Sequence, residues 1–272
     1  MNQVVATATR SGVTGDFAAL LDALRAQRAR VVELGRGLSA EEWRAPSRCT
    51  EWNVHEVVRH LVDVKGRIPS VLRGEPTGDT EFDPNTTPKR WLEETAGLTP
   101  ADTCDELERT TATQVQAIEE FARSGADRCI PGAYGDLHWT MFVLHVFWDS
   151  WLHERDVVLP LGRPHDSSEI ENRWAAAYGV SIAAVPTLMI EPGVRVGERI
   201  GLQGAGGGAF ALDVLGEVRV SFDGAIQPDD LRGELGPVLD SMAGRGPELD
   251  EVLHGPSERV ARLAYVRAFL RA

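Results

Sequence analysis

Residues 138–162 read HWTMFVLHVFWDSWLHERDVVLPLG, and this stretch decides the fold. Apolar side chains cover almost the whole circumference of the helix that it predicts, so the helix is expected to be buried among others. Three polar residues, His145, Asp149 and His153, follow one another at intervals of four and therefore share one helix face. Imidazole and carboxylate groups are costly to bury unless they are paired or bind a metal ion. The segment therefore predicts a buried bundle helix with a polar stripe that needs partners.

A second predicted helix spans residues 53–72, NVHEVVRHLVDVKGRIPSVL. Asn53 and Glu56 have the spacing of a capping box, in which each side chain accepts a hydrogen bond from the backbone of the other. Valine and leucine side chains form the buried face of this helix, and His60 lies on another side. Pro69 is expected to disturb the end of the helix, because proline lacks the N–H group that a helix interior uses.

Asp149 and His153 stand one helical turn apart, a spacing that lets one helix present two ligands to a single ion. His60, on the second helix, offers a third ligand. Two imidazole nitrogens and one carboxylate suit zinc, and three protein ligands leave a fourth position for water or substrate. Without a metal, Asp149 and His153 would form an ordinary buried hydrogen-bonded pair, so spacing alone leaves both interpretations open. His145 is expected to be a core residue, although a ligand or a supporting donor would have the same spacing.

The rest of the N-terminal part predicts further helices and their connections. Residues 1–13 are expected to be a flexible tail. A helix is expected from about Phe17, ended by Gly35 and Gly37, and another from Thr99, where a Thr-Pro pair favours a helix start. Residues 73–90 are rich in Pro, Gly, Asp and Thr and are expected to be irregular, as are residues 124–137.

After Gly162 the pattern changes, and a short linker is expected to lead into a second region. A helix is expected around residues 174–190, where Pro186 breaks or bends it. Three short runs of β-forming residues then predict strands at 199–202, 209–215 and 218–222. The pattern returns to helix from about Leu231.

The glycine-rich run from Gly204 to Gly208 lacks the strand-to-helix setting of a phosphate-binding loop, so a tight hairpin is expected there. The predicted fold class is therefore α plus α+β. Its N-terminal domain is an all-α bundle over residues 14–162, and a smaller α+β domain occupies residues 170–272.

Composition narrows the classes of function. The chain has 28 Lys and Arg against 41 Asp and Glu, a net charge of −13, which disfavours binding to nucleic acid or to anionic membranes. No apolar run approaches the ~20 residues that span a bilayer, and the N-terminus lacks a signal-peptide pattern, so a cytoplasmic location is expected. Cys49, Cys104 and Cys129 are too few and too widely spaced for a disulfide framework. Each is expected to be a core residue, although Cys49 lies just before the helix of His60.

Two segments carry a family resemblance. Residues 46–61, PSRCTEWNVHEVVRHL, and residues 147–162, FWDSWLHERDVVLPLG, resemble elements of the mycothiol-dependent maleylpyruvate isomerase family. The resemblance implies a DinB-like metal-binding four-helix bundle in which His60, Asp149 and His153 hold zinc. It also shows a departure, because the isomerases carry glutamate where this chain has the shorter Asp149.

The resemblance implies thiol chemistry. Relatives bind mycothiol with its sulfur on zinc, and metal coordination converts a thiol into the nucleophilic thiolate. Attack on an electrophilic small-molecule substrate leads to isomerisation if the adduct collapses, or to S-transfer if the adduct is released. Arg245 follows Gly244 in a Gly-Arg pair that resembles a family segment, which implies contact with an anionic substrate.

Two other classes of function stay open at this point. The bundle would be a non-catalytic binding or scaffold module if its ligand set were a structural remnant. It would be a metal-dependent hydrolase if the metal activated water instead of a thiol. The sequence does not identify the electrophile, the thiol or the oligomeric state.

Overall fold

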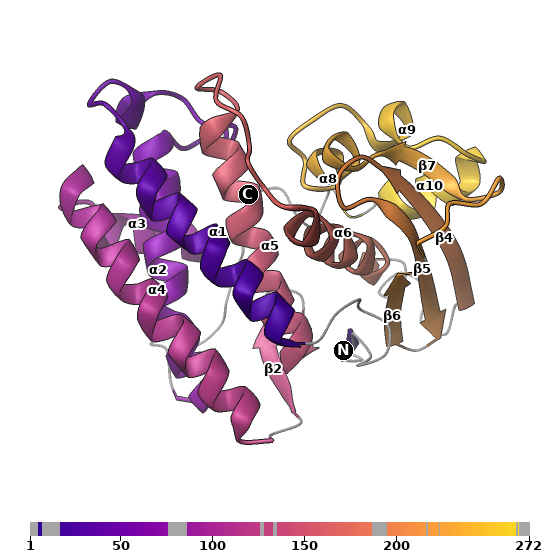
Figure 1. Cartoon of the computed structure of the whole chain (residues 1–272), viewed down its shortest axis with the longest axis horizontal. Coiled ribbons are helices and arrows are strands. Elements are labelled where there is room, and N and C mark those ends of the chain that lie inside the picture. The colour runs from indigo at the N-terminus through magenta and orange to yellow at the C-terminus, as the bar shows by residue number, and fades with distance from the viewer. Residues whose placement is uncertain are drawn as a thin grey trace. The chain divides into compact units, whose positions relative to one another are not determined.

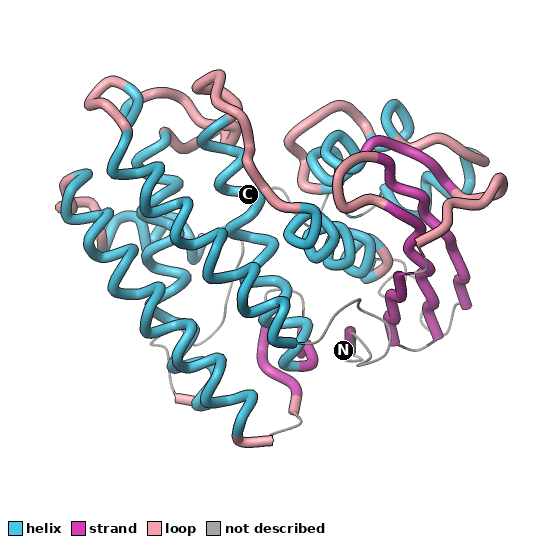
Figure 2. The backbone as a smooth tube through the Cα atoms, in the orientation of Figure 1, coloured by secondary structure: helices cyan, strands magenta, loops and turns pink. Residues whose placement is uncertain are grey.

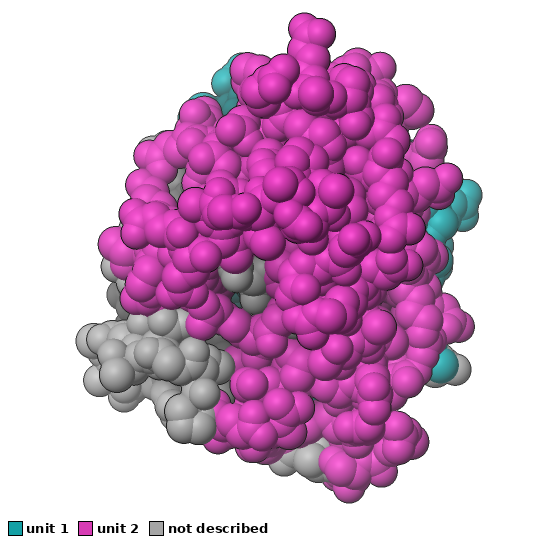
Figure 3. All heavy atoms as spheres, turned by 90° about the vertical axis from the view of Figure 1, so that its left-hand side faces the viewer, with its two compact units in different colours: residues 1–20, 134–148, 167–271 teal, residues 21–133, 149–166, 272 magenta. Residues whose placement is uncertain are grey.

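The computed structural model describes residues 5–6, 17–75, 86–125, 128–132, 135–186, 195–215, 217–222, 224–264 and 266 (Figures 1 and 2). The chain divides into two compact units, which Figure 3 distinguishes by colour. The helical unit comprises residues 21–133 and 149–166, and the sheet unit comprises residues 1–20, 134–148 and 167–271. The units therefore interleave along the chain. We keep the domain limits expected from the sequence, 14–162 and 170–272, as a proposal.

The helical unit is built from long helices that pack along one another (Figure 1). Its elements are most of α1 (Phe17–Gly37), the short helix η1 (Glu42–Arg44), α2 (Val54–Arg73), α3 (Thr87–Glu94), α4 (Pro100–Arg123), β2 (Cys129–Gly132) and the second half of α5 (Trp139–Val158). Val57 and Leu61 of α2 pack with Leu107 of α4 in a core that excludes water. Burial of these apolar faces is what stabilises the bundle.

The predicted start of α2 is confirmed. The Asn53 side chain accepts a hydrogen bond from the Glu56 N–H at 3.0 Å, and Glu56 accepts one from the Asn53 N–H at 2.8 Å. Pro69 lies inside α2, which ends at Arg73, one residue beyond the expected span. Ile68 and Leu72 are buried on either side of Pro69 and hold these last turns against the bundle.

Two stretches expected to be irregular contain regular structure. α3 begins inside residues 73–90, at Thr87, and buries Trp91 and Leu92. Residues 124–137 contain β2 and all but the last residue of β3 (Gly135–His138). These elements are only four to eight residues long and contain Pro or Gly. They therefore hold too few apolar residues to form a recognisable helix or strand periodicity.

The sheet unit contains the first half of α5 and the helices α6 (Glu169–Ala183), α8 (Leu235–Met242), α9 (Leu249–Val252) and α10 (Ser257–Ala264). Its strands are β1 (Val5–Ala6), β3, β4 (Arg195–Gln203), β5 (Gly208–Leu215), β6 (Glu217–Phe222) and β7 (Leu231–Glu234), in the spatial order β3-β1-β6-β5-β4-β7. β5 pairs antiparallel with both β4 and β6, whereas β7 lies parallel to β4. The helical bundle and this mixed sheet with its helices confirm the α plus α+β fold class.

Details of the sheet unit differ from the sequence expectations. β1 lies inside the segment expected to be a flexible tail, where it pairs with β3 and β6. The chain at Leu231 is strand β7, and the helix follows only at Leu235. α6 begins at Glu169, before the expected start, because Ser168 and Glu171 form a capping box. Residues 187–190 of the helix expected around 174–190 lie outside the described residues.

The glycine run between β4 and β5 is the expected hairpin turn. Gly204 and Gly206 have positive φ angles of 108° and 80°, which residues with a side chain rarely adopt. A Cβ atom at Gly206 would also lie 2.2 Å from the carbonyl oxygen of Glu169. The glycines are therefore explained by backbone geometry. No helix in the described part of the chain is long and apolar enough to span a bilayer.

Candidate metal centre

Helices α2 and α5 bring the three expected ligands together in the helical unit. His60 comes from α2, and Asp149 and His153 stand one turn apart on α5. One donor atom from each residue lies within 4.8 Å of the other two. The Nε2 atom of His153 is 3.5 Å from Oδ1 of Asp149, and the rings of His60 and His153 meet edge to face with centroids 5.0 Å apart.

The shorter carboxylate still reaches the centre. A tetrahedral ion with bonds of about 2.1 Å separates its ligand atoms by roughly 3.4 Å. The 3.5 Å between Asp149 Oδ1 and His153 Nε2 is close to that separation. The spacing of Asp149 and His153 therefore suits a zinc-sized ion despite the missing methylene at position 149, and His60 offers a donor within 4.8 Å of both.

The three side chains differ in their access to solvent. His60 and His153 are buried, at 6% and 3% exposed, whereas the Asp149 side chain is 18% exposed. Asp149 is therefore the ligand with the most access to solvent, although its Oδ2 atom is itself buried. Burial lowers the pKa of the His153 imidazole, but Asp149, Cys49 and the hydrogen bond to Asp156 raise it, and the resulting pKa is about 10. In the metal-free protein, His153 therefore carries a proton at neutral pH.

A second group of side chains surrounds the other nitrogen of His153. Nδ1 of His153 donates a hydrogen bond to Oδ2 of Asp156 at 3.1 Å. The Cys49 thiol donates to the same oxygen at 3.1 Å and lies 3.7 Å from Nδ1. Cys49, His153 and Asp156 are all buried, and their donor atoms also lie within 4.8 Å of one another. His153 is thus shared by two clusters that use its opposite nitrogens.

The sequence assigns no role to Asp156, although it fills the last position of the acidic-x3-His-x2-Asp pattern that residues 149–156 share with the family resembled. Its signal is a position three residues after His153 on a helix that is apolar almost all round, since a carboxylate there needs a buried partner. Cys49 was expected to be a core residue and is buried, but its thiol contacts Asp156 as well as apolar neighbours.

The loop before α2 is held by its own hydrogen bonds. The Ser47 hydroxyl donates to the carbonyl oxygen of Trp52 at 2.7 Å and accepts from the Cys49 N–H at 3.0 Å. The Trp52 N–H donates to the Cys49 carbonyl at 2.9 Å. The indole of Trp52 packs against the ring of His60, with the two ring centroids 4.9 Å apart. This short loop therefore fixes Cys49 beside one imidazole and Trp52 beside the other.

Helix α1 supplies positive charge behind α5. The guanidinium of Arg28 is wholly buried and donates to the Ser150 hydroxyl, near the charges of Asp149 and Glu154. Arg30 pairs with both carboxylate oxygens of Glu154, at 2.6 and 3.0 Å. Burial raises the pKa of Glu154, but hydrogen bonds from His165 and Arg30 hold it below its usual value. The acidic residues of α5 are thus matched by cations.

Other residues singled out in the sequence lie elsewhere. His145 belongs to the sheet unit, where Nδ1 lies 2.6 Å from the Tyr178 hydroxyl, and among the described residues it joins neither donor cluster. His55, on α2, is hydrogen-bonded to Thr103 through Nε2 at 2.9 Å, and among the described residues it also joins neither donor cluster. Arg245 follows α8 in the sheet unit and donates to the Ala243 carbonyl at 3.0 Å.

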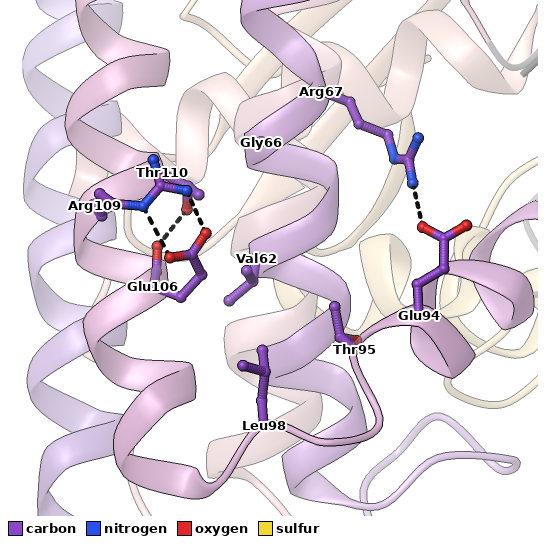
Figure 4. Close-up of a pocket in the computed structure, with 9 residues that line it drawn as sticks. All are labelled: Val62, Gly66, Arg67, Glu94, Thr95, Leu98, Glu106, Arg109 and Thr110. Carbon is purple, nitrogen blue, oxygen red and sulfur yellow. Dashed lines mark hydrogen bonds and ion pairs between the residues drawn. The ribbon is translucent and has the colours of Figure 1, made fainter. Parts of the chain in front are cut away.

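A cavity of about 360 Å³ opens between α2, α3 and α4 (Figure 4). Its described lining includes none of His60, Asp149 and His153. Two internal ion pairs, Arg67 with Glu94 at 2.9 Å and Arg109 with Glu106, occupy its charged groups. The cavity is therefore separate from the donor clusters.

Comparison with known proteins relates residues 24–158, which include most of the helical unit, to a known family. Two solved structures resemble the chain, the mycothiol-dependent maleylpyruvate isomerase and a histidine-to-alanine mutant of it. Each has a TM-score of 0.58 and covers 87% of this chain and 91% of its own, at 16% and 15% sequence identity respectively. No curated protein matches the chain. A family model described as the mycothiol maleylpyruvate isomerase N-terminal domain matches residues 24–158, and this part of the chain therefore belongs to that family.

Proposed function

We propose that this protein is a mycothiol-dependent isomerase or S-transferase whose helical unit holds a zinc ion through His60, Asp149 and His153. The observation that carries the proposal is the convergence of these three donors within 4.8 Å, inside the matched family domain. When bound, zinc would lower the pKa of the mycothiol thiol, so that the sulfur is present as the nucleophilic thiolate.

The residues of the chain would prepare the site in three ways. His60 and His153 offer neutral nitrogen ligands once His153 has released its proton. Trp52 covers the ring of His60 and excludes water from that side. Asp149, the most exposed of the three, leaves an approach for a small thiol and its substrate.

Metal analysis of the purified full-length chain tests the site. One zinc ion per chain is expected, and His60→Ala should lose it. His55→Ala is the matched control, because it removes an imidazole from the same helix outside the donor clusters. A wild-type protein without a stoichiometric divalent ion, or a His60→Ala variant that keeps both metal and activity, would refute the proposal.

The reaction is tested with mycothiol and maleylpyruvate or another electrophile, followed by mass spectrometry. Isomerised product with mycothiol regenerated indicates an isomerase, whereas a released thioether indicates an S-transferase. Loss of either product on chelation is expected. Turnover without any thiol would instead support a hydrolase, and metal binding with no turnover would support a binding module.

Arg245 is proposed to contact an anionic substrate. Arg245→Ala should raise KM for a carboxylate substrate more than it changes kcat, because the lost interaction is with a remote charge. Arg219→Ala, which removes an exposed arginine from the same unit, is the control. An unchanged KM in Arg245→Ala would remove this residue from the site.

A further inference from the structure

We infer that Asp156 is a positioning residue of the metal centre: together with the Cys49 thiol it fixes His153 so that Nε2, and not Nδ1, faces His60 and Asp149. The inference deepens the proposed function and rests on it, since it assigns the group that orients one of the ligands.

The two nitrogens of His153 have different partners. Nδ1 is 3.1 Å from Asp156 Oδ2, and Nε2 is 3.5 Å from Asp149 Oδ1. A neutral imidazole has one N–H group and one lone pair. If the N–H group is on Nδ1 and donates to Asp156, the lone pair is on Nε2 and is available to an ion. The hydrogen bond therefore selects the tautomer that the donor cluster requires.

Asp156 is itself held in place from several sides. Its side chain is fully buried, and Oδ2 accepts hydrogen bonds from both Cys49 and His153. Its backbone carbonyl accepts from the Arg48 N–H at 3.1 Å, and the Arg48 guanidinium lies 4.0 Å from Oδ1. A buried carboxylate is stable only with such donors, so the loop that carries Arg48 and Cys49 keeps it an acceptor.

Cys49 acts here as a hydrogen-bond donor. The residue is 2% exposed, so its thiol is kept from contact with an electrophile in solution. The distances from Sγ to Asp156 and from Nδ1 to Asp156 are those of hydrogen bonds. A second ion between Cys49, Asp156 and Nδ1 would need an imidazole that had lost both protons and bridged two metals. One ion, supported by these two residues, is the simpler arrangement.

The test measures zinc affinity by competition with a chromophoric chelator, using the full-length protein. Asp156→Ala should bind zinc about 10- to 100-fold more weakly, the usual cost of removing the partner of a ligating histidine. Asp156→Asn, which keeps an acceptor oxygen and most of the packing, should lose less and covers the case in which the alanine variant fails to fold.

Glu154→Ala is the matched control, because it removes an equally buried carboxylate from the same helix. It should lower stability but weaken zinc binding much less than Asp156→Ala does, since its partners Arg30 and His165 are not ligands. Equal losses of affinity in Asp156→Ala and Glu154→Ala would mean that Asp156 acts only through folding, and would overturn the inference.

The Cys49→Ser variant distinguishes a role of Cys49 as hydrogen-bond donor from a role as metal ligand. The serine hydroxyl can donate to Asp156, so zinc affinity should stay close to the wild-type value. Loss of metal in Cys49→Ser, or two zinc ions per wild-type chain, would show that Cys49 is a ligand and overturn the inference.

Imidazole ¹⁵N NMR of the zinc-loaded protein provides a direct readout. His153 should be protonated on Nδ1 and bound through Nε2, and the reverse assignment would exclude the proposed role. A wild-type protein that binds no zinc would refute the proposed function and this inference together. A wild-type protein that binds zinc, beside an Asp156→Ala variant of equal affinity, would refute the inference alone.

Discussion

Raising the pH should lower the stability of the metal-free protein and raise its apparent affinity for zinc, and His153 is the cause of both trends. Its pKa in the metal-free fold is about 10, against an ordinary value of 6.5. Below pH 6.5 the folded and unfolded chains both hold the proton, so the favourable contacts of the imidazolium with Asp149 and Asp156 are fully present. Above pH 6.5 the unfolded chain loses the proton first, and this stabilisation declines towards pH 10.

The expected size follows from the shift in pKa. One pKa unit corresponds to about 1.4 kcal/mol, so the metal-free protein should lose up to about 1.4 kcal/mol of unfolding free energy per pH unit above 6.5. Over the whole interval the upper limit is about 5 kcal/mol. Zinc must displace the same proton, so its apparent affinity should rise about tenfold per pH unit over the same range.

Two assays follow the two trends. Denaturant unfolding of the metal-free protein at pH 6.5, 7.5 and 8.5 gives the free energy of unfolding, and chelator competition at the same pH values gives zinc affinity. Calorimetry in buffers of different ionisation enthalpy should detect about one proton released per zinc bound at pH 7.5. Zinc affinity that does not change with pH, or zinc binding without proton release, would refute the assignment of a protonated His153.

Further outcomes follow from single contacts. Asp149→Asn should lower the pKa of His153, because it removes a neighbouring negative charge, and NMR titration should show the shift; an unchanged pKa would contradict the electrostatic account. Asn53→Ala should destabilise the protein by about 1 kcal/mol through loss of the helix cap, measured by chemical denaturation. Gly206→Ala should cost about 1–3 kcal/mol because its φ is positive and its Cβ would meet the Glu169 carbonyl. Gly197→Ala, whose Cβ would have its nearest contact at 3.7 Å, should cost less, and an equal cost would contradict the steric argument.

The sequence predicts much of the fold because its strongest patterns are local. The capping box at Asn53 and the apolar run of α5 determine where two site helices begin and pack, and spacing places Asp149 and His153 on one face. The sequence predicts helix from Leu231 and does not predict β7, because the four residues Leu231–Glu234 are equally compatible with a first turn of the helix that follows.

The supporting residues of the site are harder to predict. Cys49 precedes α2 by a loop whose path depends on hydrogen bonds among Ser47, Cys49 and Trp52, and no periodic pattern describes such a loop. Asp156 lies on α5, but its partner in that loop is 107 positions away in the chain. Residue type makes His60 a candidate third ligand, but only the family resemblance implies that it lies beside Asp149 and His153, because contact between two helices is a tertiary property.

The polar residues of α5 also fix the rotation of that helix within the bundle. Asp149, His153 and Asp156 turn toward α2 and its preceding loop, whereas Ser150 and Glu154 meet α1 through Arg28 and Arg30. Turning α5 by one residue, or sliding it along its axis, would break the Glu154 ion pair and separate the donor atoms at once. The contacts of Ser150 and Glu154 with α1 thus fix the rotation and register of α5, and they do not depend on metal. They leave the ligand face preformed in the empty protein, so that an ion can bind without a change of helix register.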